Sequence, residues 1–315
     1  MKSILFVKTS SLGDVVHHCP AVSDAAAALP GAAIDWVVEE PFAGVAAMHP
    51  AVRRVIPVKV RRWRNALWDP AVWSEMGEFR RSLAAERYDV VIDTQGLLKS
   101  ALVCRFASGT KHGMDRSSAR EPMASRFYDV RHLVPRGLHA VERNRRLTAA
   151  SLGYALEDKF QYGLRISMDN PATAGSAPSG GAYSVLLTMT SRADKLWPES
   201  RWVELGRALD TPLVVPWGSE AERERAERIA GGIGQATVPE RMSLSQLGEL
   251  LSKAKAVVGL DTGLTHLAAA LGATTVGIYC GSDPALTGLY GAERAKNVGA
   301  PGRAPEVADV LKSLS

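Results

Sequence analysis

"ILFVKTSSLGDVVHHCPAV" (residues 4–22) places a strand-like run, a small polar turn and a helix-like run in direct succession. Four apolar residues predict a short buried strand, and the valines and alanines beyond the turn predict a helix. A strand that leads through a short turn into a helix is the repeating unit of a parallel sheet. The stretch therefore predicts an α/β fold, with one carboxylate, Asp14, in its first turn.

Two roles fit Asp14. Aspartate and serine are preferred at helix N-termini, so Asp14 can serve the helix alone. Ligands of open parallel sheets bind beyond the carboxyl ends of the strands, so the same carboxylate can act there as a catalytic base. Small residues, Ser10, Ser11 and Gly13, flank Asp14 in this turn. The turn by itself leaves both roles open.

The alternation of strands and helices continues along the chain of 315 residues and restarts after residues 167–182. That stretch lacks periodicity and is rich in Pro, Gly, Ser and Ala, which is typical of a linker. We therefore expect an N-terminal domain over 1–166, a linker over 167–182 and a C-terminal domain over 183–315. Both should be Rossmann-like βα domains that face each other across a cleft, with the last helix packing in part on the N-terminal domain.

Composition indicates the compartment. The 3 cysteines, Cys19, Cys104 and Cys280, are far apart and have no metal-ligand spacing, so we expect neither a disulfide framework nor a zinc site. The first residues do not have the pattern of a signal peptide, and no run of about 18 apolar residues occurs. These features predict a protein without a transmembrane helix that is cytosolic, or bound to a membrane surface from the cytosol.

Positive charge is concentrated in the first half. Residues 1–166 hold 24 Lys and Arg against 17 Asp and Glu, whereas residues 167–315 hold 14 against 16. The segment "RRVIPVKVRRWRN" (53–65) has six cations and no acid. Such a run suggests a polyanionic partner, which could be nucleic acid, anionic lipid or a phosphorylated sugar. A solvated basic face accounts for it equally well.

Two later motifs suit a diphosphate. In "VVGLDTGLTHLAAALG" (257–272) a strand ends at Asp261, a turn of Thr262 and Gly263 follows, and His266 lies one helical turn further on. The free N–H groups of such a helix start bind anions, although Asp261 can also merely cap the helix while His266 packs. In "LLTMTSRADKLWPESRW" (186–202) Lys195 follows a strand-end cluster of hydroxyls. That pattern suits a diphosphate or a solvent-facing capping loop.

Other residues and absent motifs narrow the function. Glu220 follows another strand and a glycine turn, where an acid can hold a ribose or only complement the helix dipole. There is no G-x-x-x-x-G-K-[ST] loop and no G-x-G-x-x-G after the first strand, which disfavours P-loop ATPases and dinucleotide-dependent oxidoreductases. No D-x-D occurs, so the sequence does not indicate a metal-bridged diphosphate.

Seven segments resemble the bacterial lipopolysaccharide heptosyltransferases of glycosyltransferase family 9, in order and spacing. They are "KTSSLGDVVH", "DTQGLLKSAL", "KHGMDRSSAREPMASRFY", "HAVERNRRL", "DKLWPE", "PWGSEAERERA" and "DTGLTHLAAAL". The resemblance implies an inverting, metal-independent enzyme of GT-B architecture with no cofactor besides its donor, ADP-L-glycero-β-D-manno-heptose. It implies transfer of L-glycero-D-manno-heptose to the inner Kdo of Kdo2-lipid A by a protein peripheral on the cytoplasmic face of the inner membrane.

The resemblance also implies residue roles. Asp14 would be the general base, and Lys195 would neutralise the departing ADP. The implied donor-binding residues are Thr190, Ser191, Lys195, Glu220, Met242, Asp261, Thr262, Gly263 and His266. The implied acceptor-binding residues are Ser10, Ser11, Gly13, Arg61, Arg62, Arg64, Lys99, Arg120 and Arg143. Thr190 and Ser191 stand where relatives often have two threonines, and both keep the hydroxyl group.

Two alternatives remain. A sibling enzyme that adds a later core heptose would share the donor half, and only the N-terminal half distinguishes it; "KHGMDRSSAREPMASRFY" favours the enzyme that adds the first heptose. A nucleic-acid-binding protein would account for the arginine clusters. It would leave the donor-like half unexplained, and the chain lacks a helix-turn-helix or aromatic–basic recognition pattern. We therefore expect ADP-heptose, Kdo2-lipid A and the inner membrane as partners, and no nucleic acid.

Overall fold

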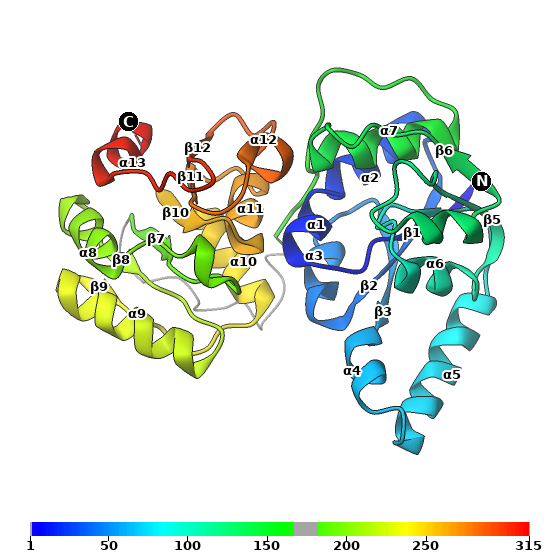
Figure 1. Cartoon of the computed structure of the whole chain (residues 1–315), viewed down its shortest axis with the longest axis horizontal. Helices are drawn as coiled ribbons and strands as arrows, with labels where there is room; N and C mark the ends of the chain where they lie inside the picture. Colours follow the sequence, from blue (N-terminus) through cyan, green and yellow to red (C-terminus); the bar gives the residue numbers. More distant parts are fainter. Residues whose placement is uncertain (1, 167–181, 315) are drawn as a thin grey trace. The chain divides into compact units, whose positions relative to one another are not determined.

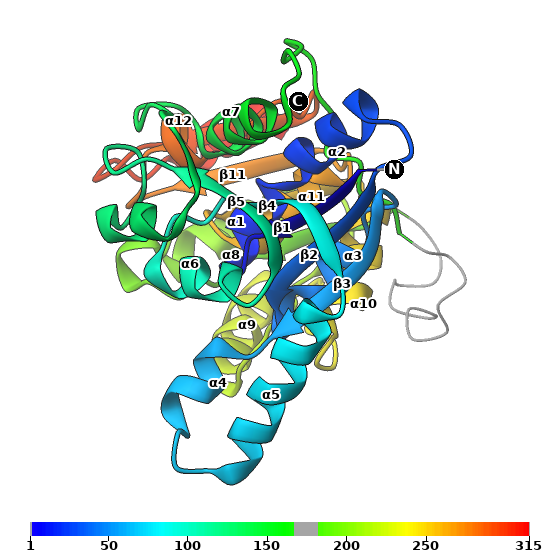
Figure 2. The ribbon, with the colours of Figure 1, turned by 90° about the vertical axis from the view of Figure 1, so that its right-hand side faces the viewer.

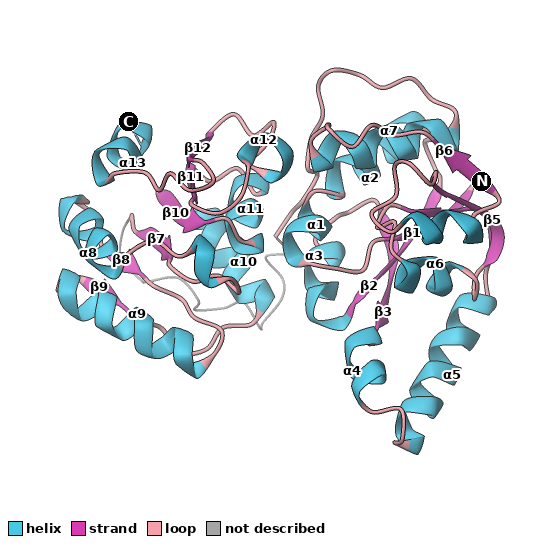
Figure 3. Ribbon diagram, in the orientation of Figure 1, coloured by secondary structure: helices cyan, strands magenta, loops and turns pink. Residues whose placement is uncertain are grey.

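The computed structural model describes residues 2–166 and 182–314 and divides into two compact units, Met1–Leu164 and Arg165–Ser315 (Figure 1). Each unit contains a six-stranded sheet with helices packed on it (Figure 3). The predicted linker over 167–182 lies outside the described residues, except for Ala182. Within the described ranges, no helix has the length and apolar character needed to cross a bilayer.

The sheet of the first unit is entirely parallel, in the order β3-β2-β1-β4-β5-β6. Its strands are β1 (Ser3–Val7), β2 (Ala33–Glu39), β3 (Val52–Val58), β4 (Arg87–Asp93), β5 (Ser108–Met114) and β6 (Val130–His132). Its α-helices are α1 (Leu12–Val16), α2 (Cys19–Ala28), α3 (Ala43–Ala47), α4 (Val60–Asn65), α5 (Pro70–Ala84), α6 (Leu98–Cys104) and α7 (Ala140–Leu152). Two 3₁₀ helices, η1 (Glu40–Phe42) and η2 (Pro122–Phe127), complete it.

Two helical layers cover this sheet. Helices α2 and α7 pack together on one face, whereas α5 and α6 close an apolar core on the other (Figure 2). Strand β1 lies in the middle of the sheet, and its apolar residues from Ile4 to Val7 are fully buried. Central parallel strands are buried on both faces, which is why this run is apolar throughout rather than alternating. The buried strand predicted at the head of the chain is confirmed.

The sheet of the second unit is also parallel, in the order β12-β11-β10-β7-β8-β9. Its strands are β7 (Ser184–Leu187), β8 (Leu213–Val214), β9 (Ala236–Thr237), β10 (Ala256–Leu260), β11 (Thr275–Tyr279) and β12 (Ala295–Gly299). Its helices are η4 (Ala193–Lys195), α8 (Glu199–Ala208), α9 (Glu220–Ile233), α10 (Leu244–Lys253), α11 (Gly263–Ala270), α12 (Pro284–Thr287) and α13 (Val307–Leu314).

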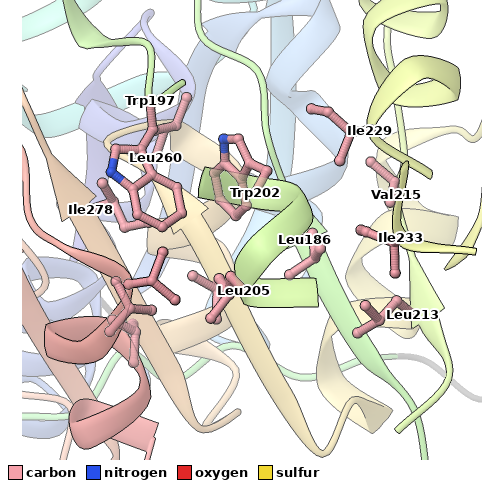
Figure 4. Close-up of a cluster of buried hydrophobic side chains, with 14 of the residues drawn as sticks. Leu186, Trp197, Trp202, Leu205, Leu213, Val215, Ile229, Ile233, Leu260 and Ile278 are labelled. Atoms are coloured by element: carbon pink, nitrogen blue, oxygen red, sulfur yellow. The ribbon is translucent and has the colours of Figure 1, made fainter. Parts of the chain in front are cut away.

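A cluster of buried side chains from α8, α9, α13 and the strands forms one core of the second unit (Figure 4). Trp197 and Trp202 are fully buried and meet edge to face, with ring centroids 5.0 Å apart. From α13, Val307 and Val310 join this cluster. The last helix therefore contributes apolar side chains to the core of its own unit. The expectation that it also packs in part on the N-terminal domain stays a prediction.

The two units share one topology. In each sheet, the second and third strands are added on one side of the first strand, and the later three strands are added on its other side. In the first unit the order changes direction beside β1 and β4, and in the second beside β7 and β10. Ligands of such sheets bind beyond the carboxyl ends of the strands at this switch point. The topology thus directs attention to the loops that follow β1, β4, β7 and β10.

Candidate functional site

Asp14 lies in the first turn of α1, just beyond β1. Its Oδ2 accepts the backbone N–H of Ser11, the N-cap residue, at 3.2 Å. The same carboxylate binds the guanidinium of Arg120 through two hydrogen bonds, of 3.0 Å to Oδ1 and 3.3 Å to Oδ2. Only 15% of the Asp14 side chain is exposed. Asp14 therefore caps the helix and also stands in a cationic site, so the two readings of the turn do not exclude each other.

This arrangement leaves room for one more partner. A carboxylate offers about four acceptor positions, and Ser11 and Arg120 fill three of those of Asp14. The remaining position suits the hydroxyl group of a bound molecule. A carboxylate within hydrogen-bond reach of such a hydroxyl has the geometry of a general base.

Lys8 is a site residue that the sequence reasoning missed. It follows β1 directly, is buried, and holds its Nζ 4.0 Å from Oδ1 of Asp14. The Nζ donates hydrogen bonds to the carbonyl of Thr94 at 3.0 Å and to Oδ1 of Asn144 at 3.4 Å. Burial lowers the pKa of Lys8 to about 8, although the negative charge of Asp14 acts in the opposite direction. Lys8 therefore remains mostly protonated at neutral pH and adds a second positive charge beside Asp14.

Hydrogen bonds join the loops across this switch point. Oε1 of Gln95, just beyond β4, accepts the backbone N–H groups of Thr9 at 3.2 Å and Ser10 at 3.3 Å. Buried Asp93 in turn accepts the N–H of Gln95 at 2.8 Å and the hydroxyl of Tyr128 at 2.7 Å. The loop that precedes Asp14 is thus fixed to the end of β4. In the sequence, the segment "DTQG" after a buried strand is the pattern that could have indicated this link between the two loops.

Several of the predicted acceptor residues lie together. Nζ of Lys99 donates to Oγ of Ser10 at 2.9 Å. Burial lowers the pKa of Lys99, Glu39 acts against this, and the positive charges of Arg61 and Arg64 lower it further. Lys99, Arg61 and Arg64 are therefore near enough to influence one another electrostatically. They form one basic region, which suits an anionic ligand.

Two predicted acceptor residues have partners inside the first unit. Arg62 pairs with Glu75 of α5 at 3.1 Å. Arg143 donates to the carbonyl of Ser118 at 2.6 Å and to Sδ of Met114 at 3.1 Å. Each arginine thus has an internal structural role as well, which a basic run in the sequence does not reveal.

Asp261 occupies the switch point of the second unit. Its Oδ2 receives Nζ of Lys195 and Oγ of Ser282, each at 2.5 Å, and its Oδ1 lies 3.2 Å from Nε2 of His266. Burial raises the pKa of Asp261, but the hydrogen bonds from His266, Lys195 and Ser282 outweigh it and hold the pKa well below its usual range. Asp261 is therefore ionised at neutral pH and holds Lys195 in place.

The N-terminus of the neighbouring helix, α11, has the residues expected of an anion-binding helix start. Thr262 is the N-cap of α11, and Gly263 is its first residue. The side chain of Asp261 binds Lys195 rather than capping α11, so the plain capping role weighed for Asp261 is wrong. Asp261, which binds the ammonium group of Lys195, directly precedes this helix start. Helix-start amides and an ammonium group both favour phosphate.

Ser282 and Gly281 were missed by the sequence reasoning. Both follow β11, and Ser282 bonds directly to Asp261. A Cβ on Gly281 would lie 2.8 Å from the backbone oxygen of Asp194, too close for a real contact. Glycine here lets the loop that carries Lys195 approach the sheet. In the sequence, "CGSDP" at the end of a buried strand is the pattern that could have indicated these two site residues.

The remaining donor residues follow other strands of the same sheet. Thr190 and Ser191 lie between β7 and η4, Glu220 begins α9 after β8, and Met242 precedes α10 after β9. Because parallel strands end at one edge, these residues share the edge that carries Asp261. Glu220 also lies 3.7 Å from Arg223 in an exposed pair along its own helix. Its part in ribose binding stays a prediction, as does that of Met242 in adenine binding.

The sequence matches the family "Glycosyltransferase family 9 (heptosyltransferase)" over residues 76–312. It is 47% identical over 295 residues to "Lipopolysaccharide heptosyltransferase 1" of Escherichia coli (strain K12), and the match covers 91% of each chain.

Two solved structures resemble the chain closely. "E. coli heptosyltransferase WaaC with ADP" superposes with a TM-score of 0.90 at 44% identity. "E. coli heptosyltransferase WaaC with ADP-2-deoxy-2-fluoro heptose" superposes with a TM-score of 0.85 at 44% identity. Each match covers 98% of both chains.

Proposed function

Since the chain belongs to glycosyltransferase family 9, the heptosyltransferases, we propose that it transfers L-glycero-D-manno-heptose from ADP-heptose to the inner Kdo of Kdo2-lipid A. The family resemblance and the α/β fold of two Rossmann-like units in a GT-B protein are confirmed. The observation that carries the substrate proposal is the 47% identity to an enzyme named "Lipopolysaccharide heptosyltransferase 1", over 91% of both chains.

The proposed reaction has one base and one leaving group. A hydroxyl of Kdo gives its proton to Asp14 while its oxygen attacks the anomeric carbon of the heptose. The bond between that carbon and the diphosphate oxygen breaks, and the electron pair leaves with ADP. Attack from the face opposite ADP inverts the anomeric configuration. Lys195 and the first amides of α11 stabilise the charge that develops on the departing diphosphate.

The basic region of the first unit supports an anionic acceptor. Arg120 and Lys8 surround Asp14, and Lys99 with Arg61 and Arg64 extends the positive charge. Kdo carries a carboxylate and lipid A carries phosphates, so both match this charge. We place the enzyme on the cytoplasmic face of the inner membrane as a peripheral protein, where such an acceptor is accessible.

Mass spectrometry tests the acceptor. The purified chain, incubated with ADP-heptose and Kdo2-lipid A, should add one heptose to the acceptor. Kdo2-lipid A that already carries the first heptose should remain unchanged. Transfer only to the heptosylated acceptor would assign the chain to the later step of the sibling enzyme.

Chelation should leave transfer intact. Lys195 and the helix start supply the positive charge for the diphosphate. Moreover, the described residues contain no cluster of three or more potential metal ligands among His, Cys, Asp and Glu. We expect the initial rate in excess EDTA to stay within about twofold of the untreated rate. Loss of activity in EDTA, restored by Mg²⁺ or Mn²⁺, would assign the diphosphate to a metal ion instead.

Charge reversal of Arg61 and Arg64 together should weaken acceptor binding and spare donor binding. With a soluble, acyl-free Kdo2 acceptor, we expect the acceptor KM to rise roughly tenfold, since each exposed pair contributes up to about 1 kcal/mol. Donor KM should not change. Acceptor KM of the unmodified enzyme should also rise with salt, because the Debye length is only about 8 Å at physiological ionic strength.

A matched control separates position from net charge. Arg87 and Arg105 are exposed and lie near the amino ends of β4 and β5, at the opposite edge of the sheet. Their double reversal changes the net charge equally and should leave both KM values unchanged. Equal effects of the two double variants, or an equal rise in donor KM, would remove Arg61 and Arg64 from the acceptor site. Arg62 is left intact because it pairs with Glu75.

A further inference from the structure

Helices α4 and α5 form a hairpin that projects from the sheet of the first unit (Figures 1 and 2). We call residues 66–73, the turn between them and the first turn of α5, the hairpin tip. Asp69 caps α5 by accepting the N–H of Ala71 at 2.9 Å, and Nε1 of Trp73 donates to the carbonyl of Leu67 at 2.8 Å. The tip is thus a defined turn closed by its own hydrogen bonds.

The tip exposes large apolar side chains. The exposed fractions are 49% for Leu67, 82% for Trp68 and 59% for Trp73. Trp63, one helical turn away, is only 7% exposed and donates its indole N–H to Glu75 at 3.1 Å. The core of the hairpin therefore uses Trp63, whereas Trp68 and Trp73 are left for contact with something outside. A cluster of exposed aromatic residues is typical of an interaction surface.

Positive charge adjoins these aromatic residues. Arg61 and Arg64 are exposed on α4. Two nearby carboxylates have cationic partners, since Glu75 pairs with Arg62 at 3.1 Å and Glu40 with Lys59 at 3.0 Å. Asp69 caps α5, and Glu78 is exposed on that helix. The hairpin therefore presents a tryptophan-rich end with a basic flank. Two copies that met through their tips would bring these like charges together, which disfavours a second copy as the occupant.

We propose that the hairpin tip inserts Leu67, Trp68 and Trp73 into the surface of an anionic lipid bilayer. Tryptophan concentrates at the level of the headgroups, where its ring is apolar and its N–H is hydrated. Each arginine near an anionic membrane strengthens binding by about fivefold. The inference deepens the proposed function, because an acceptor lipid is presented at such a surface.

Vesicle sedimentation tests the docking without the reaction. Vesicles of phosphatidylcholine, with and without phosphatidylglycerol, contain no acceptor lipid. We expect the chain to bind only the phosphatidylglycerol vesicles. The double variant Leu67→Ser/Trp68→Ser should bind them at least tenfold more weakly, because full burial of one such side chain is worth about tenfold or more. Trp68→Phe keeps an apolar ring and should still bind, with less quenching of its fluorescence by brominated lipid.

Leu133→Ser is the matched control. Leu133 is also largely exposed and follows β6, outside the hairpin, so its loss should leave vesicle binding unchanged. Binding of Leu67→Ser/Trp68→Ser at the level of the unmodified chain, or equal binding to both kinds of vesicle, would overturn the proposal. So would tip-dependent dimers in sedimentation velocity.

Activity measurements separate docking from catalysis. With a soluble, acyl-free acceptor, Leu67→Ser/Trp68→Ser should keep its kcat and both KM values. With the acceptor embedded in phosphatidylglycerol vesicles, the rate should fall in parallel with binding. Loss of activity on the soluble acceptor would make the tip part of the catalytic site and overturn the proposal. If neither acceptor receives heptose even from the unmodified chain, the proposed function fails while the vesicle measurement still decides the docking.

Discussion

Asp14→Asn should abolish heptose transfer while ADP still binds. Asparagine has nearly the same shape but cannot take up the proton of the attacking hydroxyl, and loss of a general base costs about 10²–10⁴-fold in rate. The proposed donor residues belong to the second unit, whereas Asp14 lies after β1. We therefore expect the dissociation constant of ADP, measured by calorimetry, to stay within about twofold of its original value.

The substitution also removes one ion pair, so a control must do the same elsewhere. Asp24 pairs with Arg145 at 2.7 Å in the same unit. Asp24→Asn should lower the melting temperature without a comparable loss of kcat. If Asp14→Asn keeps more than a tenth of the original rate, Asp14 is a capping and pairing residue and the base lies elsewhere. If it no longer binds ADP, the separation of donor and acceptor residues between the units is wrong.

Local sequence patterns were sufficient to predict the central strands of both sheets. Strands β1, β7 and β10 are short apolar runs, β4 contains the apolar run 90–92, and each of the four is followed by a polar turn. Their burial on both faces leaves little choice of residue type. Because the switch points lie at the ends of these same strands, the turns with Asp14 and Asp261 could be found from sequence as well.

Strand β5, nearer the edge of its sheet, carried no such signal. Strand β5 reads "SGTKHGM" and has two glycines and two charged or titratable residues. It became part of a sheet because β4 and β6 offer backbone partners on either side, which is tertiary context that propensity does not contain. Gly113 in this strand has a structural reason, since a Cβ there would overlap the ring of Tyr128.

Partners distant in the chain explain what the sequence reasoning missed around the sites. Lys8 reaches Asn144, and Gln95 reaches the N–H groups of Thr9 and Ser10. Only the folded sheet brings these residues together. The basic run also looked uniform in sequence, yet Arg62 pairs with Glu75 whereas Arg64 adds to the positive charge around Lys99. Charge counts predict the sign of such a region but not which of its cations have internal partners.

Lys195→Met should lower kcat by about 10²–10³-fold, the usual cost of removing one group that stabilises charge in the transition state. Lys195 is held by Asp261 at 2.5 Å, beside the first turn of α11. As the bond to the heptose breaks, negative charge grows on the diphosphate, and a fixed ammonium group stabilises it without reorganisation. Donor KM should rise as well, because the ground state of ADP-heptose already carries two charges. Steady-state kinetics with varied donor measures both effects.

Lys195→Met also leaves Asp261 without its ion-pair partner. A control must therefore distinguish the loss of charge stabilisation on the leaving group from the loss of an ion pair. Lys253 pairs with Glu249 at 2.6 Å at the end of α10, which leads to the amino end of β10, the opposite edge of the same sheet. Lys253→Met should keep the original kcat and donor KM. Lys195→Arg, which retains the charge, should recover part of the rate. If Lys195→Met keeps more than a tenth of kcat, or Lys253→Met loses as much, Lys195 only braces the loop after β7, and the leaving group is stabilised by other residues.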